Sequence, residues 1–228
     1  MPQVFTSWSG GKDSCFAFYT AISQGVKIAH LVNTVANDSK RVRFHGVPAE
    51  IIRAQADAIG INLIQEETSW DGYEKEFREA VGALVKDGVG SIVTGDIHLE
   101  DSRRWIEKVS ADLGLGVLTP LWGRRSEDIL EEFIRDGFVA TVVSAQADTF
   151  DKSWIGRRID QEFLHDIKGI KGIDVCGENG EYHTLVTDGP IFKKKVEIGE
   201  TRVVYKESQW GSSRTAHHLL DILDFSLR

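Results

Sequence analysis

A glycine-rich turn between an expected strand and an expected helix constrains this chain more than any other feature. Residues 3–7 form a β-branched and aromatic run, and the apolar run that starts at Cys15 is typical of a buried helix ending near Gly25. Adjacent glycines permit positive φ, and a turn that opens a helix directs unpaired backbone N–H groups toward one point. Such a point binds an anion, usually a phosphate. The turn reads Ser9-Gly10-Gly11-Lys12-Asp13-Ser14.

The turn differs from the Walker A loop of many nucleotide-binding proteins. Walker A requires Ser or Thr directly after the lysine and an additional upstream glycine, whereas here Asp13 follows Lys12 and Thr6 occupies the glycine position. Lys12 contributes a full positive charge, and Ser9 and Ser14 contribute hydroxyl groups. The alternative is a plain glycine turn with a solvated lysine, and six specific residues in one strand–turn–helix setting argue against it.

Composition limits the classes of protein that the chain can belong to. The 228 residues are 41% hydrophobic and 27% charged, which is typical of a globular protein with ample material for a core. The net charge of −8 argues against a general nucleic-acid or anionic-membrane binder, although residues 193–195 form a local basic run. Two separated cysteines argue against a structural zinc site. With no signal peptide pattern and no long apolar run, we expect a cytoplasmic protein that does not contact membranes.

Strands and helices are expected to alternate over the first half of the chain. An amphipathic or proline-initiated helix separates most of the strands, which favours an α/β fold with a five-stranded parallel sheet and helices on both faces. The expected strands are Gln3–Ser7, 27–34, 61–64, 91–94 and 117–118. The remainder is punctuated by glycines and predicts a smaller α+β domain, with Gly199-Glu200 as the tip of a hairpin. We therefore expect two domains, at 1–122 and 123–228.

Polar residues follow three of these strands at the edge where parallel sheets bind ligands. Ligands bind beyond the carboxyl ends of parallel strands, where the strand order reverses. The glycine-rich turn follows the first strand, Asn33 and Thr34 end the second, and Gly95 and Asp96 follow the fourth. We expect these groups to face one crevice, although Gly95-Asp96 would also suit a plain strand-ending turn.

A second polar cluster lies in the C-terminal third. Residues 174–186 combine carboxylates, a thiol, an imidazole, hydroxyls and glycines directly before and within an expected strand. Each residue alone fits a turn or a solvated surface, but their concentration in one loop is typical of a functional site. The candidates are Gly177, Glu178, Glu181, Tyr182, His183 and Thr184. Cys176 is better explained as a small buried apolar residue than as a nucleophile.

Together these motifs resemble the diphthine–ammonia ligase family of PP-loop, N-type ATP pyrophosphatases. The similarity runs from Val4 to about Glu197, and Gly-Glu-x-Gly-Glu-Tyr-His-Thr at 177–184 is its most specific part. Further matching segments are Gly95-Asp96-Ile97, Arg103-Arg104-Trp105, Glu107, Pro120-Leu121-Trp122 and Asp188-Gly189-Pro190. The resemblance implies a PP-loop/HUP-like fold and an enzyme that adenylates the carboxylate of diphthine on elongation factor 2. Ammonia then displaces AMP and leaves an amide.

The resemblance and the positions along the chain together suggest roles for individual residues, with ATP and Mg²⁺ as cofactors. The ATP-binding candidates are Ser9, Gly10, Gly11, Lys12, Asp13, Ser14, Asn33, Thr34, His45, Gly95 and Asp96. The catalytic candidates are Lys12, Asp13, Glu178, Glu181 and His183. The acceptor candidates are Trp122, Gly177, Glu178, Glu181, Tyr182, His183 and Thr184, and the Mg²⁺ candidates are Asp13 and Asp96. His45 is expected near adenine, with a surface-loop histidine as the alternative, and Tyr182 and Trp122 are expected to contact the quaternary ammonium of diphthine.

Two other functions remain compatible with the sequence. One is a different PP-loop enzyme that acts on tRNA or on a small carboxylic acid, although an acidic, cysteine-poor chain lacks the basic face and cysteine pairs that tRNA thiolation requires. The other is a non-catalytic ATP-binding module. The sequence leaves the oligomeric state open, a homodimer included.

Overall fold

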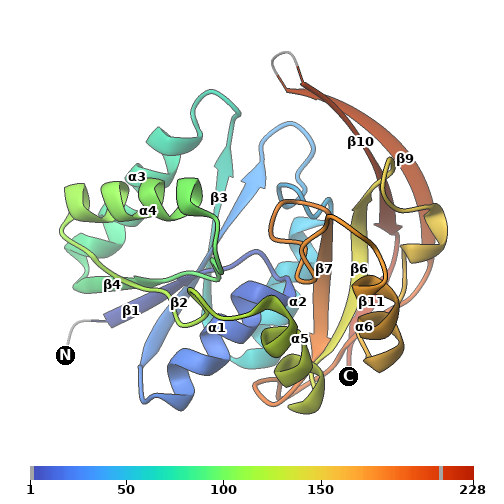
Figure 1. Ribbon diagram of the computed structural model, residues 1–228. Helices are drawn as coiled ribbons and strands as arrows, with labels where there is room; N and C mark the ends of the chain where they lie inside the picture. The colour runs from blue at the N-terminus through green and yellow to red at the C-terminus, as the bar shows by residue number, and fades with distance from the viewer. Residues whose placement is uncertain (1–2, 211–212) are drawn as a thin grey trace.

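Five parallel strands form the central sheet of the computed structural model, which describes residues 3–210 and 213–228 (Figure 1). The strands are β1 (Gln3–Ser7), β2 (Ile28–Ala36), β3 (Asn62–Thr68), β4 (Val89–Val93) and β5 (Gly116–Leu118). Their order is β3-β2-β1-β4-β5, so β1 lies between β2 and β4. The direction of strand addition therefore reverses at β1 and β4, and the carboxyl ends of these two strands mark the ligand-binding edge.

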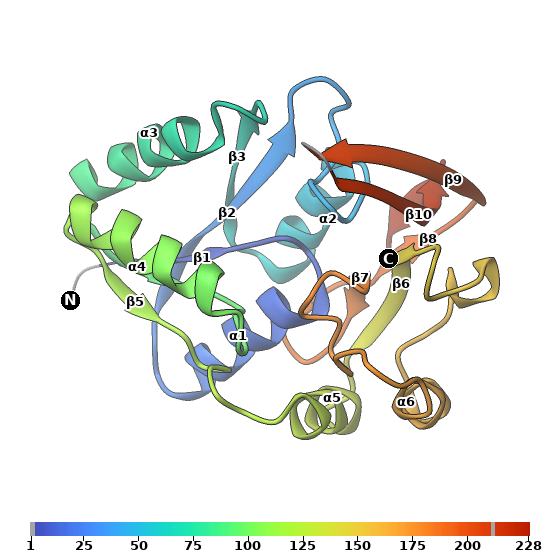
Figure 2. The same ribbon diagram turned by 45° about the horizontal axis from the view of Figure 1, so that its top comes forward.

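Helices cover both faces of this sheet (Figures 1 and 2). On one face lie α3 (Tyr73–Lys86) and α4 (Glu100–Leu113), and on the other lie α1 (Lys12–Ser23) and α2 (Ala49–Ile59). The spacing of Phe77, Val81 and Leu84 places one apolar stripe of α3 in the core. The fold class predicted from the sequence, an α/β protein with a five-stranded parallel sheet, is confirmed.

The C-terminal half contributes a second, antiparallel sheet with the order β7-β6-β10-β9. Its helices are α5 (Ser126–Arg135) and α6 (Gln161–Lys168), with a short 3₁₀ turn, η1 (Lys152–Trp154), between them in sequence. Its strands are β6 (Val139–Gln146), β7 (Tyr182–Asp188), β9 (Thr201–Trp210) and β10 (Ser213–Ile222). Two short strands, β8 (Val196–Ile198) and β11 (Phe225–Leu227), pair separately. The long β9–β10 pair curves along one edge of the molecule (Figures 1 and 2).

The predicted hairpin tip at Gly199-Glu200 is wrong. β8 pairs with β11 and β9 pairs with β10, so the chain passes from one small sheet to another at these two residues. The Gly199 N–H donates to the carbonyl of Asp224 at 2.9 Å, which ties this crossing to the segment before β11. β10 is not anticipated from the sequence, because its run of histidines and arginine lacks a clear apolar alternation.

One continuous apolar cluster joins the two halves. It contains Phe16 of α1 and Ile52 of α2 together with Phe138, Val143 and Leu185 of the second half. The second sheet therefore packs directly against the face of the first sheet that carries α1 and α2. The domain boundary at 122/123 stays a prediction, and this shared core brings the 174–186 cluster against the glycine-rich turn.

Candidate active site

The glycine-rich turn lies between β1 and α1 at the point where strand order reverses. Gly10 has a φ of +81°, and a Cβ there would lie 2.4 Å from Cδ1 of Ile52, so both the conformation and the packing require glycine. The Gly11 N–H donates to Oγ of Ser9 at 3.3 Å, and Oγ of Ser14 donates to the carbonyl of Gly11 at 3.1 Å. The loop is therefore held in shape by its own serines at the amino end of α1.

Lys12 is almost completely buried, and its side chain reaches across to the second half of the protein. Its Nζ donates to Oδ2 of Asp13 at 2.9 Å and to the carbonyl of Cys176, and it lies 4.9 Å from the ring centroid of Tyr182. Burial acts to lower the pKa of Lys12, but its interactions with Asp13, Tyr182 and Cys176 together outweigh burial and raise that pKa. The ammonium group is therefore permanently charged at this position.

Three carboxylates, Asp13, Asp96 and Glu178, lie in this region. Oδ1 of Asp13 is buried and has no hydrogen-bond partner within the described residues, and Oδ1 of Asp96 accepts from Ser102 at 2.5 Å. Oε1 of Glu178 accepts from the backbone N–H of Ile97 at 2.9 Å. Burial, assisted by the charges of Asp13 and Asp96, raises the pKa of Glu178 to about 7. Glu178 can therefore exchange a proton near neutral pH.

The carboxylates are compatible with a nucleotide-bound Mg²⁺. Across the described ranges, no group of three or more His, Cys, Asp or Glu residues forms a metal site of protein ligands alone. Mg²⁺ in ATP-dependent enzymes needs only one or two carboxylates, because phosphates and water fill its other positions. The unpartnered oxygen of Asp13 beside Asp96 meets that requirement.

The Glu178 pKa predicts an unusual dependence of stability on pH. Because the folded-state pKa lies above the usual value of 4.5, this group stabilises the fold fully below pH 4.5 and loses that contribution as the pH rises through about 7. Glu178→Gln removes this titration, so the stability of the variant relative to wild type should be about 3 kcal/mol higher at pH 8 than at pH 4.5. Urea unfolding at both pH values measures this difference. An identical difference at the two pH values would contradict the pKa assignment.

Strand β7 is hydrogen-bonded to the glycine-rich turn. The Lys12 N–H donates to Oγ1 of Thr184 at 3.0 Å, and the Val186 N–H donates to the carbonyl of Gly10 at 2.9 Å. Gln55 is completely buried and donates to the carbonyls of both Gly10 and Val186, while its Oε1 accepts from Trp8. The two sequence motifs are therefore joined by hydrogen bonds.

Replacing Gln55 by leucine should destabilise the protein by about 2–4 kcal/mol, because the Trp8 N–H and the Val186 carbonyl would lose their buried partner. Thermal unfolding monitored by circular dichroism measures the change. Gln24→Leu at an exposed position is the matched control and should change stability little. Equal melting temperatures for Gln55→Leu and wild type would contradict this role.

Three of the predicted acceptor residues, Gly177, Glu181 and Tyr182, are buried in or against the 174–181 loop. Glu181 is buried and accepts from the backbone of Asp174 at 2.8 Å and of Asn179 at 2.9 Å, so it holds the 174–181 loop in shape. Gly177 has a φ of +72°, and a Cβ there would lie 2.7 Å from the Tyr182 ring. Tyr182 is buried and donates to the carbonyl of Val175. The acceptor roles of these residues stay predictions.

The other predicted residues lie around the turn. Asn33 is buried and bonded to Trp8 and Gln65, so its side chain fixes strand ends, while Thr34 hydrogen-bonds Tyr73. His45 Nδ1 donates to the Thr184 carbonyl at 2.9 Å, and its Cε1 would lie 2.6 Å from a Cβ at Gly11. Burial lowers the pKa of His45 to about 4 and lowers that of His183 well below its usual value.

Trp122 lies beneath a cation, with the guanidinium of Arg103 at 4.3 Å from its ring centroid.

Two structurally important residues, Gln55 and Asp174, were not predicted from the sequence. Gln55 links the two halves of the protein, and Asp174 accepts hydrogen bonds from the backbone of the 174–181 loop. A signal for Gln55 was present, because it is a polar residue between Ile52 and Ile59 on the buried stripe of α2.

Within the residues described, no helix has the length and apolar character needed to cross a membrane.

The fold and the turn define a PP-loop ATP-binding α/β protein. The chain belongs to the diphthamide synthase family, because the model of the diphthamide synthase N-terminal domain matches residues 2–117 and that of the C-terminal domain matches residues 125–218.

Curated relatives and one solved structure are similar to this chain. The diphthine–ammonia ligase of Homo sapiens is 31% identical over 86% of this chain and 82% of its own length, and that of Bos taurus is 30% identical over the same shares. The crystal structure titled as a predicted subunit of tRNA methyltransferase from Methanocaldococcus jannaschii has a TM-score of 0.45 and 15% identity, over 83% of this chain and 98% of the other.

Proposed function

We propose that this chain is an ATP-dependent, AMP-forming ligase that converts the carboxylate of diphthine on elongation factor 2 into an amide with ammonia. The observation that carries the proposal is the contact of the PP-loop lysine with the second motif, since Lys12 meets Asp13, Cys176 and Tyr182 in one buried cluster. Membership of the diphthamide synthase family and similarity to diphthine–ammonia ligases support the choice of substrate.

The first step is attack of an acceptor carboxylate oxygen on the α-phosphorus of ATP. The bond from that phosphorus to the bridging oxygen breaks, pyrophosphate leaves, and an acyl-adenylate remains. Negative charge grows on the departing oxygen, and we assign its stabilisation to the N–H groups at the start of α1 together with Lys12. Ser9 and Ser14 keep the loop in the geometry that this requires.

Mg²⁺ would be held by Asp13 and Asp96, and when bound it supplies neutralisation of phosphate charge. The unpartnered Oδ1 of Asp13 supports this assignment, because a buried carboxylate oxygen without a donor is costly unless a ligand supplies one. Such a cation would also lower the pKa of Glu178, whose rise partly reflects the charges of Asp13 and Asp96.

The second step is attack of ammonia on the acyl carbon, with departure of AMP and formation of the amide. The attacking nitrogen loses a proton, and we assign Glu178 as the base because burial raises its pKa above that of an ordinary carboxylate. His183 is a poorer base, because burial lowers its pKa well below the usual value. We therefore assign proton transfer to Glu178, and the hydrogen bonds of Glu181 favour a positioning role for that residue.

The two halves would divide this work, with residues 1–122 binding ATP and residues 123–228 binding the acceptor. The two halves are not separate at the PP-loop, because Thr184 is hydrogen-bonded to Lys12 and Val186 is hydrogen-bonded to Gly10. We infer that acceptor binding and the shape of the PP-loop are coupled through β7.

Incubation with ATP, Mg²⁺, ammonium and diphthine-bearing elongation factor 2 tests the proposal. We expect AMP and pyrophosphate in equal amounts, together with an amidated factor detected by mass spectrometry. Factor without diphthine is the control and should give neither product. AMP formed without amidation of the factor would indicate a PP-loop enzyme with another acceptor, and recovery of intact ATP would indicate a non-catalytic ATP-binding module.

A further inference from the structure

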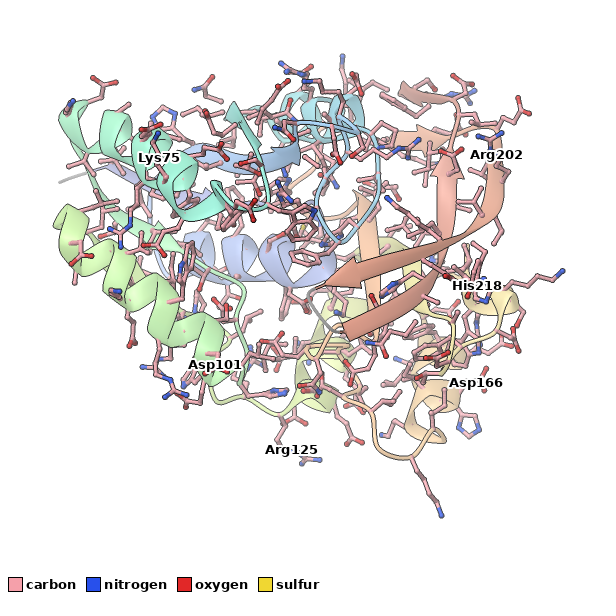
Figure 3. All side chains as sticks on the ribbon, turned by 90° about the horizontal axis from the view of Figure 1, so that it is seen from above. Lys75, Asp101, Arg125, Asp166, Arg202 and His218 are labelled. Carbon is pink, nitrogen blue, oxygen red and sulfur yellow. The ribbon has the colours of Figure 1, made fainter. Side chains whose placement is uncertain are left out.

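A groove of about 640 Å³ lies between the segment after β2 and the second sheet. Segment 36–46 forms one wall, and side chains from β6, β7, β9 and β10 form the other. Arg202, at the start of β9, marks the second wall in Figure 3, where Lys75 and Asp101 lie on the helices of the opposite side of the molecule. The steps of the proposed reaction give most of this groove no role.

A buried arginine on the groove has an unused donor. Arg43 is 7% exposed, and its Nε and Nη2 donate to Thr68, but its Nη1 is buried without a hydrogen bond to any described residue. A buried donor without an acceptor is costly, so we expect a ligand of the groove to bring an acceptor. A polypeptide brings one carbonyl oxygen with every residue.

The groove is basic although the chain as a whole is acidic. In a chain of net charge −8, it presents four basic side chains against two carboxylates. The basic side chains are Arg41, Arg43, Arg202 and Lys206, and the carboxylates are Asp38 and Asp221. Asp221 accepts from Arg41 at 2.6 Å and from Arg202 at 2.7 Å, so a single carboxylate serves two guanidinium groups. The excess positive charge suits the carbonyls and carboxylates of a polypeptide, whereas the two carboxylates would repel a run of phosphates.

Two exposed aromatic side chains stand on the groove. Phe44 has a φ of +64°, which is unfavourable for a bulky residue, and yet its ring is 63% exposed. Trp70 is 53% exposed, and the two ring centroids lie 6.0 Å apart. Because an exposed ring gains little from packing, the strain at Phe44 indicates a role in contacting a ligand. Exposed aromatic side chains are also the usual anchors of protein–protein interfaces.

The groove comes within a side chain's length of the PP-loop. His183 lines the groove, and its ring centroid lies 6.2 Å from that of Phe44 and 4.8 Å from that of His45. His45 packs against Gly11, where a Cβ would lie 2.6 Å from its Cε1. In the proposed reaction the acceptor carboxylate must reach the α-phosphorus at this loop, so the polypeptide that carries it must lie nearby. The groove meets that condition at His183.

We propose that this groove docks the polypeptide on either side of the modified residue of a protein acceptor, while the modified side chain passes His183 and His45 to the PP-loop. The inference rests on the proposed function and adds segment 36–46 to the half that binds the acceptor. Carbonyl groups of the docked segment accept from Arg43, its acidic side chains meet Lys206, and Phe44 contacts it at the rim. The reacting carboxylate stays free to attack the α-phosphorus.

Lys206→Glu and Phe44→Gly test the groove without changing a group assigned to the reaction. With diphthine-bearing elongation factor 2, the KM for the factor should rise about fivefold in Lys206→Glu and about tenfold in Phe44→Gly, with an unchanged KM for ATP. Lys206 is exposed and glycine relieves the positive φ at position 44, so both melting temperatures should stay close to that of wild type. Lys171→Glu makes the same charge change at an exposed position outside the groove and should alter neither KM.

Elongation factor without diphthine separates docking of the polypeptide from binding of the reacting side chain. It should inhibit wild type competitively against the modified factor, and its inhibition constant should rise in each variant by the same factor as the KM. An unchanged KM in either variant, or no inhibition by the unmodified factor, overturns the groove assignment, while AMP formation by wild type leaves the proposed function intact.

If wild type forms no AMP with the modified factor, the proposed function fails, and calorimetry with that factor then decides the groove. Binding that weakens in Lys206→Glu and Phe44→Gly but not in Lys171→Glu supports the assignment, and equal or absent binding overturns it. Binding of bulk tRNA that weakens in these two variants, with binding of the factor unchanged, would assign the groove to a nucleic acid and also overturn the proposal.

Discussion

Lys12→Ala is expected to abolish AMP formation, lowering turnover about a thousandfold. The ammonium is buried beside Asp13 with a raised pKa, and the proposed mechanism assigns it to stabilising the departing pyrophosphate. Low dielectric around it strengthens its interaction with developing negative charge. Quantification of AMP by chromatography under saturating ATP and acceptor measures the effect.

Lys27→Ala removes a charge of the same kind at an exposed position and should leave turnover unchanged. Thermal unfolding of both variants separates chemistry from folding, because the alanine at position 12 also leaves Asp13 without its partner. Near-normal turnover by a folded Lys12→Ala protein would remove the PP-loop from the mechanism.

Gly95→Ala should lower AMP formation about a hundredfold, since displacement of reacting groups by about 1 Å has effects of that size. A Cβ at position 95 would lie 2.7 Å from the carbonyl carbon of Asp13 and 2.8 Å from the nitrogen of Ser14. Both are backbone atoms at the start of α1, so the PP-loop itself must move. We also expect a loss of about 2 kcal/mol in the free energy of unfolding. Initial rates and urea unfolding measure the two effects.

Gly82→Ala is the matched control, because no atom would lie within 4 Å of its Cβ and it sits inside α3. That substitution should raise stability by about 1 kcal/mol and leave the rate unchanged. If Gly95→Ala retained the wild-type rate, close packing of β4 against the PP-loop would not matter for catalysis.

The first sheet could be predicted from the sequence because each of its elements carries a local signal. Pro48 and Gly60 stand at the two ends of α2, and apolar residues at helical spacing define α3. The second sheet was harder to predict. β10 contains few apolar residues, and its pairing with β6 and β9 depends on contacts between distant segments. Local patterns do not determine such pairings.

The candidate site could be predicted only in part for the same reason. The PP-loop and the 174–186 cluster stand out as motifs, but nothing in either motif indicates that Thr184 accepts a hydrogen bond from Lys12. The buried state of Glu181 and the strained, exposed ring of Phe44 are likewise properties of the folded chain. The motifs predict the class of chemistry, and tertiary structure was needed to find which of their side chains hold loops.

The fate of an acceptor oxygen tests the central claim most directly. If the carboxylate of the acceptor is labelled with heavy oxygen, attack on the α-phosphorus transfers one labelled oxygen to AMP when ammonia displaces it. We predict labelled AMP and unlabelled pyrophosphate in mass spectra of the reaction products. Labelled inorganic phosphate accompanied by ADP would show attack on the γ-phosphorus and would contradict the account.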